Sequence, residues 1–147
     1  MNNKRGMECE LPDGGIRQVM NYLAEEDGAF YIQRCTAIDQ AHPLMPGTSF
    51  HFSVSAEELR RLAQNGIWEL VLDVYPRGAK ADSIVSYSDF QKSACLCRVF
   101  YYDCRFLDLY VKNPGLFAGL KRLLLSLGAE NLYDITDASD QRTELGL

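Results

Sequence analysis

The cysteines are the first candidates for chemistry, because thiols can hold a metal ion or act as nucleophiles. Cys95 and Cys97 form a C-x-C pair, and Cys104 follows in the same apolar region. A structural zinc site needs a second pair of Cys or His ligands a few residues apart, and extended chain would separate Cys97 from Cys104 by on the order of 17 Å. We therefore expect buried, reduced thiols, with no metal and no cofactor.

A thiol nucleophile would also need a general base within hydrogen-bonding reach. The chain has two histidines, His42 and His51, and His51 with Cys35 is the one pairing worth weighing. No motif around either residue indicates that the two side chains meet in the fold. The sequence thus favours a protein that is not an enzyme.

The C-terminal region carries closely spaced carboxylates. Asp134, Asp137 and Asp140 give it the oxygen content of a calcium-binding loop, but the required Gly and Glu positions are missing. Arg142 follows, and its guanidinium would bind one of these carboxylates in a bidentate manner if the tail folds back. The alternative is a disordered acidic tail that gives Arg142 no fixed partner.

A hairpin is the first of the elements that would position these residues. Residues 95–102 and 105–112 have the period-two pattern and the aromatic and β-branched content of strands. Asp103 and Cys104 would then form a two-residue turn.

This register divides the hairpin into two sides. Phe100 lies opposite Leu107 on the side that we assign to the core. The other side carries a mixed aromatic and acidic set that suits a binding surface, where tyrosine is enriched. Its members are Tyr101, Phe106, Asp108 and Tyr110. The alternative is that another element covers this side.

A leucine-rich helix follows the hairpin. Asn113 and Pro114 form a strong helix start, and Gly128 is well placed to end the helix. Apolar residues recur between them at helical spacing, which predicts a stripe that packs on the core side of the hairpin. The stripe consists of Leu116, Phe117, Leu120, Leu123, Leu124 and Leu127.

The remaining pattern alternates short strands with helices. Further strands are predicted at residues 4–11, 30–35, 50–54, 67–75 and 132–135, further helices at residues 13–28 and 55–66, and a loop at residues 37–48. We predict one α+β domain over residues 1–147, with a mixed or mainly antiparallel sheet and helices packed on one face. A doubly wound parallel fold is the alternative, but its phosphate-binding glycine signature is missing.

Charge and hydropathy exclude some partners. The net charge of −5 argues against binding to nucleic acid or to an anionic membrane, which requires a basic face. No apolar run reaches the length of a membrane span, and the N-terminal residues lack the apolar stretch of a signal peptide. We therefore expect a soluble, cytoplasmic protein, and the sequence does not specify its oligomeric state.

The second half of the chain resembles a known family. The shared pieces are Tyr87–Phe90, Tyr102–Cys104, Leu109–Lys112, Ile135–Asp137, Asp140, Arg142 and Thr143. In these pieces the chain is similar to a family of small uncharacterised bacterial proteins, a domain of unknown function found mainly in Bacillus-like species. The resemblance covers roughly the last 60 residues, departs from the family at the very C-terminus, and implies a soluble bacterial protein without a known activity.

Two functions remain in view. The first is a non-enzymatic protein that binds another protein, as a regulator or as the immunity-type partner of a bacterial toxin. The second is a small enzyme or small-molecule binder, with a pocket between the hairpin turn and the C-terminal cluster. That polar cluster would comprise Asp103, Cys104, Thr136, Asp137, Asp140 and Arg142.

Overall fold

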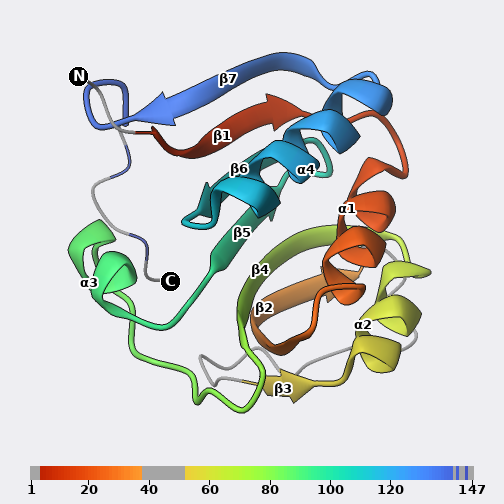
Figure 1. The fold of residues 1–147 in the computed structure, drawn as a ribbon. Helices are drawn as coiled ribbons and strands as arrows, with labels where there is room; N and C mark the ends of the chain where they lie inside the picture. The colour runs from red at the N-terminus through yellow and green to blue at the C-terminus, as the bar shows by residue number, and fades with distance from the viewer. Residues whose placement is uncertain (1–3, 38–51, 141, 143–144, 146–147) are drawn as a thin grey trace.

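The computed structural model describes residues 4–37, 52–140, 142 and 145, and in this part of the chain seven strands form one sheet (Figure 1). The strands are β1 (Lys4–Glu10), β2 (Gly28–Ala37), β3 (Phe52–Val54), β4 (Ile67–Pro76), β5 (Cys97–Tyr102), β6 (Phe106–Val111) and β7 (Glu130–Thr136). The helices are α1 (Gly15–Ala24), α2 (Ala56–Ala63), α3 (Tyr87–Lys92) and α4 (Pro114–Ser126). The predicted loop at residues 37–48 lies almost entirely outside the described residues.

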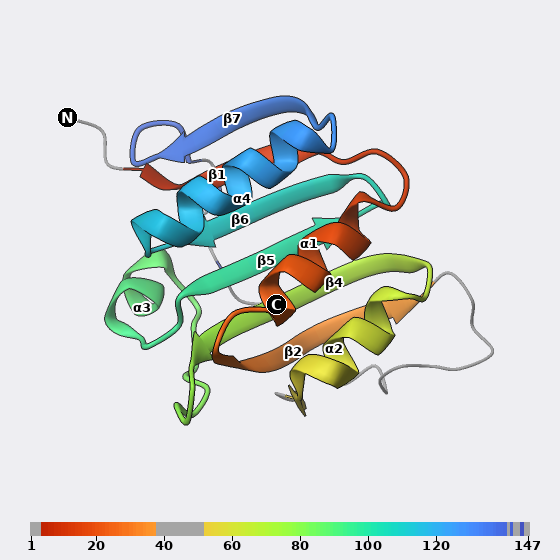
Figure 2. The same ribbon diagram turned by 45° about the vertical axis from the view of Figure 1, so that its right-hand side comes forward.

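The sheet order is β3-β2-β4-β5-β6-β1-β7, and every pairing is antiparallel. This confirms the predicted α+β class and excludes the doubly wound parallel alternative. Helices α1, α2 and α4 lie side by side over one face of the sheet, here called the first face (Figure 2). The opposite face is called the second face. Among the described residues, no helix has the length and apolar character needed to cross a membrane.

The leucine-rich helix α4 forms as predicted. The Asn113 side chain accepts hydrogen bonds from the first-turn amides, and Gly128 has the positive φ of 78° that suits a residue just past a helix end. Leu116, Leu120 and Leu124 are buried against the first face. Three buried leucines stabilise the helix on the sheet by roughly 1.5–3 kcal/mol each.

The first helix starts differently from the prediction. Gly14, with a φ of 78°, is the N-cap of α1, and no side chain caps this end. The helix therefore begins at Gly15, after the start expected at residue 13, and Asp13 does not cap it. Helix α2, in contrast, is capped by Ser55, whose side chain accepts a hydrogen bond from the Glu58 amide.

The turn of the β5–β6 hairpin spans residues 103–105, one residue more than predicted. Tyr102 pairs with Phe106, and the Arg105 amide donates to the Tyr102 carbonyl over 3.2 Å. Asp103 and Cys104 have positive φ angles of 55° and 57°. Residues other than glycine rarely adopt this conformation, so nothing in the residue types marked the longer turn.

The longer turn shifts β6 by one residue, which moves every β6 side chain to the other face relative to β5. Phe100 therefore pairs with Asp108 and lies on the second face, not with Leu107 in the first-face core as predicted. Tyr101 pairs with Leu107 on the first face and is 4% exposed. Its assignment to a binding surface is wrong.

One end of the second face is covered by two segments that are distant in sequence. Residues 77–96, which include α3, pack over it, and Leu145 inserts beside them. The segments bury a second, smaller core. Its members are Val71, Tyr75, Ile84, Phe90, Cys95, Phe100, Tyr110, Ile135 and Leu145.

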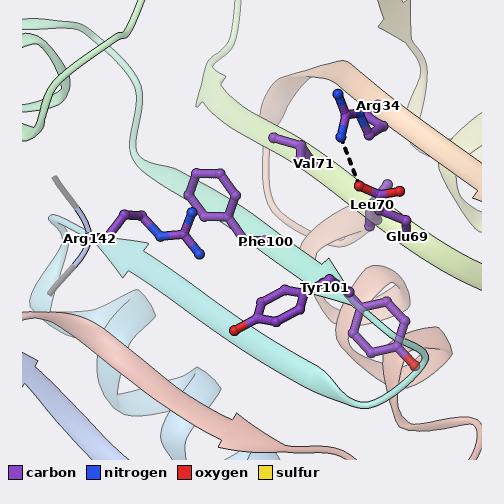
Figure 3. Close-up of a pocket in the computed structure, with 8 residues that line it drawn as sticks. Arg34, Glu69, Leu70, Val71, Phe100, Tyr101 and Arg142 are labelled. Carbon is purple, nitrogen blue, oxygen red and sulfur yellow. Dashed lines mark hydrogen bonds and ion pairs between the residues drawn. The ribbon is translucent and has the colours of Figure 1, made fainter. Parts of the chain in front are cut away.

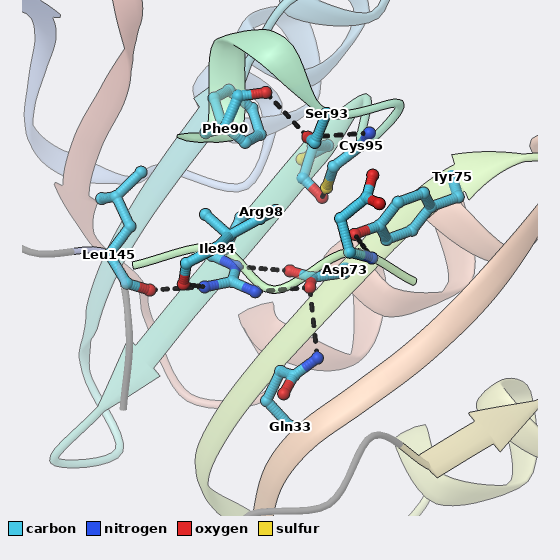
Figure 4. A network of polar contacts seen from close by, with 11 residues as sticks. Gln33, Asp73, Tyr75, Ile84, Phe90, Ser93, Cys95, Arg98 and Leu145 are labelled. Carbon is cyan, nitrogen blue, oxygen red and sulfur yellow. Dashed lines mark hydrogen bonds and ion pairs between the residues drawn. The ribbon is translucent and has the colours of Figure 1, made fainter. Parts of the chain in front are cut away.

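An ion pair is buried beneath this cover (Figure 4). The Arg98 Nε and Nη2 atoms donate to the two Asp73 carboxylate oxygens, each over 2.6 Å, and the two side chains are 2% and 0% exposed. Gln33 donates to the same carboxylate over 3.3 Å. Arg98 Nη1 donates to the carbonyls of Ile84 and Leu145. One guanidinium thus joins two central strands to both covering segments.

Removing one member of this pair should destabilise the fold strongly. In Arg98→Met the Asp73 carboxylate would stay buried without its partner, and we expect the free energy of unfolding to fall by about 3–5 kcal/mol. Urea denaturation followed by circular dichroism measures this. The double variant Asp73→Leu/Arg98→Met should recover part of the loss, because it leaves no unpaired charge. Equal stability of wild type and Arg98→Met would contradict the buried pair.

Candidate functional site

A pocket of about 310 Å³ opens on the second face, beside the covered end (Figure 3). Val71 and Phe100 give it an apolar lining, and Arg34 and Arg142 stand on opposite sides of Phe100 in the view. The complete lining is Arg34, Glu69, Leu70, Val71, Phe100, Tyr101, Tyr102 and Arg142. Such a lining combines apolar surface with cationic groups.

Both arginines of the pocket are held by carboxylates. Arg34 Nη1 donates to Glu69 over 2.9 Å, and Arg142 Nη2 donates to Asp108 over 2.7 Å. The Arg142 guanidinium also lies 4.1 Å from the centre of the Phe100 ring, a cation–π contact. Burial is the largest single effect on Arg142 and lowers its pKa. The hydrogen bond that Arg142 donates to Asp108 and the negative charges of Asp108 and the nearby tyrosines together outweigh burial and leave the pKa raised. Each guanidinium of the pocket is therefore already partly neutralised by a carboxylate.

Next to the pocket, side chains of four adjacent strands remain uncovered on the second face. We call this set the exposed strip, and it consists of Glu8, Glu10, Tyr102, Phe106 and Tyr133. The Tyr102 and Phe106 rings stack with centroids 5.5 Å apart, and Tyr133 is 60% exposed. Exposed aromatic rings are typical of protein-binding surfaces.

Only part of the predicted binding surface coincides with this strip. Phe106 belongs to it, and Asp108 lies at its border, where Arg142 binds it. Tyr110 is on the correct face but is 1% exposed beneath Phe90 and Phe100, with which it makes edge-on ring contacts. The alternative prediction, that another element covers this side, therefore holds for Tyr110.

Described residues of the segment after β7 fold back onto the sheet and form a polar cluster. Asp140 accepts hydrogen bonds from Arg5 Nη1, the Tyr110 hydroxyl and the Arg142 amide over 3.0–3.1 Å. Asp137 accepts from Arg5 Nε over 2.7 Å, and this bond is the main reason why the pKa of Arg5 is raised. These residues therefore agree with the prediction of a tail that folds back, and not with a disordered tail.

The predicted partner of Arg142 is wrong, however. Its guanidinium binds Asp108 of β6, not one of the nearby tail carboxylates. Thr136 exchanges hydrogen bonds with Ser139 and closes a turn after β7, as part of the local structure. Lys4 and Lys121 bind Asp134 and lower its pKa, although burial acts in the opposite direction.

The hairpin turn and the tail cluster do not form one pocket. Asp103 is exposed at the turn, and Cys104 bonds through its amide to the Trp68 carbonyl over 3.2 Å. Extended strand between Cys104 and Tyr110, the residue that contacts the tail cluster, spans roughly 20 Å. The polar site predicted from these residues is therefore divided into two separate places.

The four buried thiols are poor candidates for nucleophilic catalysis. All five cysteines are free. Burial raises the pKa of Cys9, Cys35 and Cys95 to about 12, and it also raises the pKa of Cys97 well above its ordinary value. These four groups are protonated at neutral pH, and the thiolate is the reactive form. His51, the proposed base for Cys35, lies outside the described residues.

Metal ligands do not cluster in the described part of the chain. No group of three or more His, Cys, Asp or Glu residues there has the arrangement needed to hold an ion. Within the hairpin, the Cys95 thiol instead donates to the Cys97 carbonyl over 3.3 Å.

The sequence reasoning missed several residues of this region, among them Arg5, Glu8, Glu10, Tyr102, Tyr133, Arg34 and Glu69. The last two meet because a bulge in β2 places Arg34 opposite Val71, beside Glu69. Glu8 could have been found, since it alternates with Met7 and Cys9 in a predicted strand. Which face it lies on depends on strand pairing, which the local pattern does not reveal.

Comparison with known proteins gives one match. A family described as "Protein of unknown function (DUF2691)" matches residues 30–146. The match covers more of the chain than the roughly 60 residues that carried the resemblance. No curated protein and no solved structure matches the chain.

Alkylation should distinguish the thiols by burial. Under native conditions we expect iodoacetamide to modify Cys104, which is partly exposed, and to spare the four buried thiols. Intact-mass spectrometry should then show one added group, and five after denaturation. Native modification of Cys95 or Cys97 would contradict the described burial.

Trypsin should test the order of the C-terminal residues. Arg142 is held against Phe100 and Asp108, whereas the side chain of Arg77 is 82% exposed. We expect cleavage after Arg77 to precede cleavage after Arg142, because proteases need locally open chain. Mass spectrometry of a digestion time course shows which of the two sites is cleaved first. Earlier cleavage after Arg142 would contradict the folded tail.

Proposed function

We propose that this chain, which belongs to the DUF2691 family of proteins of unknown function, is a non-enzymatic bacterial protein that binds another protein through the exposed strip. It would act in the cytoplasm as a regulator or as the immunity-type partner of a toxin. The single observation that carries the proposal is the exposed strip itself, with its stacked Tyr102 and Phe106 rings and the protruding Tyr133.

Three properties make this part of the molecule suitable for a partner. The strands that carry it are paired and anchored by the first-face core, so the side chains are presented by a rigid support. Aromatic side chains supply large contact areas at low conformational cost. The adjacent pocket offers a place for one side chain of the partner, an arrangement typical of binding hot spots.

The proposal of a non-enzymatic protein is supported by the state of the potential nucleophiles. The four buried thiols have raised pKa values, and the arginines of the pocket are paired with carboxylates. The five free thiols also fit a reducing compartment such as the cytoplasm.

The pocket favours one alternative function, the binding of a small molecule. Its volume of about 310 Å³ lies at the lower end of the range for ligand sites. An acidic, planar molecule could stack on Phe100 between Arg34 and Arg142. We rank this alternative second, because Glu69 and Asp108 already neutralise both arginines.

Affinity capture from the bacterial host tests the proposed function. The bait is wild type, the strip variant Phe106→Ser/Tyr133→Ser, or the control Leu125→Ser. Leu125 is 61% exposed on α4, on the other side of the sheet, so its replacement removes similar apolar surface elsewhere.

A partner protein should be retained by wild type and by the control, and its recovery on the strip variant should fall about tenfold or more. Quantitative mass spectrometry measures recovery, and circular dichroism verifies that all baits are folded. Recovery of the same proteins at the same level on all three baits would overturn the proposal.

A further inference from the structure

Carboxylates of the exposed strip face other carboxylates across the strands. Glu8 of β1 lies opposite Asp108 of β6, and Glu10 lies opposite Glu130 of β7. Like charges in directly opposite positions destabilise a sheet. In the pair of Glu8 and Asp108, the Arg142 guanidinium binds and partly neutralises only Asp108.

Within the described residues, Glu8 is less well satisfied than Asp108 and Glu10. Among the described residues it forms no ion pair, and its side chain is exposed. Burial and the nearby carboxylates of Asp108 and Asp140 raise its pKa. Glu10, by comparison, is bonded by Asn131 and lies 3.7 Å from the Arg105 guanidinium. A positive charge placed at Glu8 would therefore meet an acidic environment.

Aromatic rings flank the same position. Tyr133 lies directly opposite Glu8 on β7, and Phe106 lies opposite Glu10 on β6, stacked on Tyr102. The faces of such rings attract cations, and arginine in particular stacks on them. Rings and carboxylates together form the surroundings that suit a guanidinium or an ammonium group.

We propose that the exposed strip recognises a basic segment of a partner protein, with an arginine or lysine side chain bound to Glu8 between the Tyr133 and Phe106 rings. This inference rests on the proposed function and specifies the chemistry of its partner. Charge complementarity with a chain of net charge −5 favours the same occupant.

A second copy of the chain fits this surface less well. Two strips brought face to face would oppose Glu8 and Glu10 with identical carboxylates, which costs binding free energy. An acidic segment meets the same repulsion. The basic segment alone gains from both the rings and the carboxylates.

A titration with defined peptides tests the inference. The probes are a short capped peptide of alternating arginine and serine, and a matched peptide with glutamate in place of arginine. Amide NMR signals of the full chain report where each peptide binds. The variants are Glu8→Gln, which keeps the shape of the side chain, and the control Glu58→Gln, an exposed carboxylate on α2.

We expect the arginine peptide to shift signals of the exposed strip, and the glutamate peptide to leave them unchanged. Glu8→Gln should weaken binding about fivefold at low salt, whereas Glu58→Gln should bind like wild type. Binding by the glutamate peptide, equal affinity of Glu8→Gln and wild type, or concentration-dependent self-association through the strip would each overturn the basic partner. None of these results removes the proposed function, which fails only if capture yields no strip-dependent partner.

Discussion

The buried contact between Asp73 and Arg98 is the interaction on which the second face depends. A carboxylate and a guanidinium removed from water must satisfy each other and their remaining hydrogen bonds, or the fold loses several kcal/mol. Arg98 meets this requirement by donating both to Asp73 and to the carbonyls of Ile84 and Leu145. The constraint therefore draws two distant segments of the chain over one end of the sheet.

The position of that cover determines which part of the second face stays open to solvent. Beneath the cover, Tyr110, Phe90 and Phe100 form a closed aromatic cluster. Beyond it, the same sheet face presents Tyr102, Phe106 and Tyr133 to solvent, and Arg142 lies at the boundary between the two regions. The pocket and the exposed strip thus lie on the part of the second face that the covering segments, held by the buried ion pair, leave open.

Local patterns predicted much of the architecture. The Asn113-Pro114 start, the leucine stripe and Gly128 specify α4, because capping and helical periodicity involve neighbours within a few residues. The alternation of apolar residues placed most strands, and the antiparallel hairpin indicated the α+β class. The candidate site was harder to predict from local patterns, because the exposed strip combines side chains from four strands.

The sequence by itself therefore determined most of the helices and strands, although not α3, and that the fold is α+β. Only the tertiary structure decided which side chains share a face. The turn at Asp103 and Cys104 adopts positive φ angles without glycine, and the extra residue moves Phe100 and Tyr101 to the faces opposite those expected. The physical reason is the two-residue period of a strand, in which a shift of one residue exchanges core and surface.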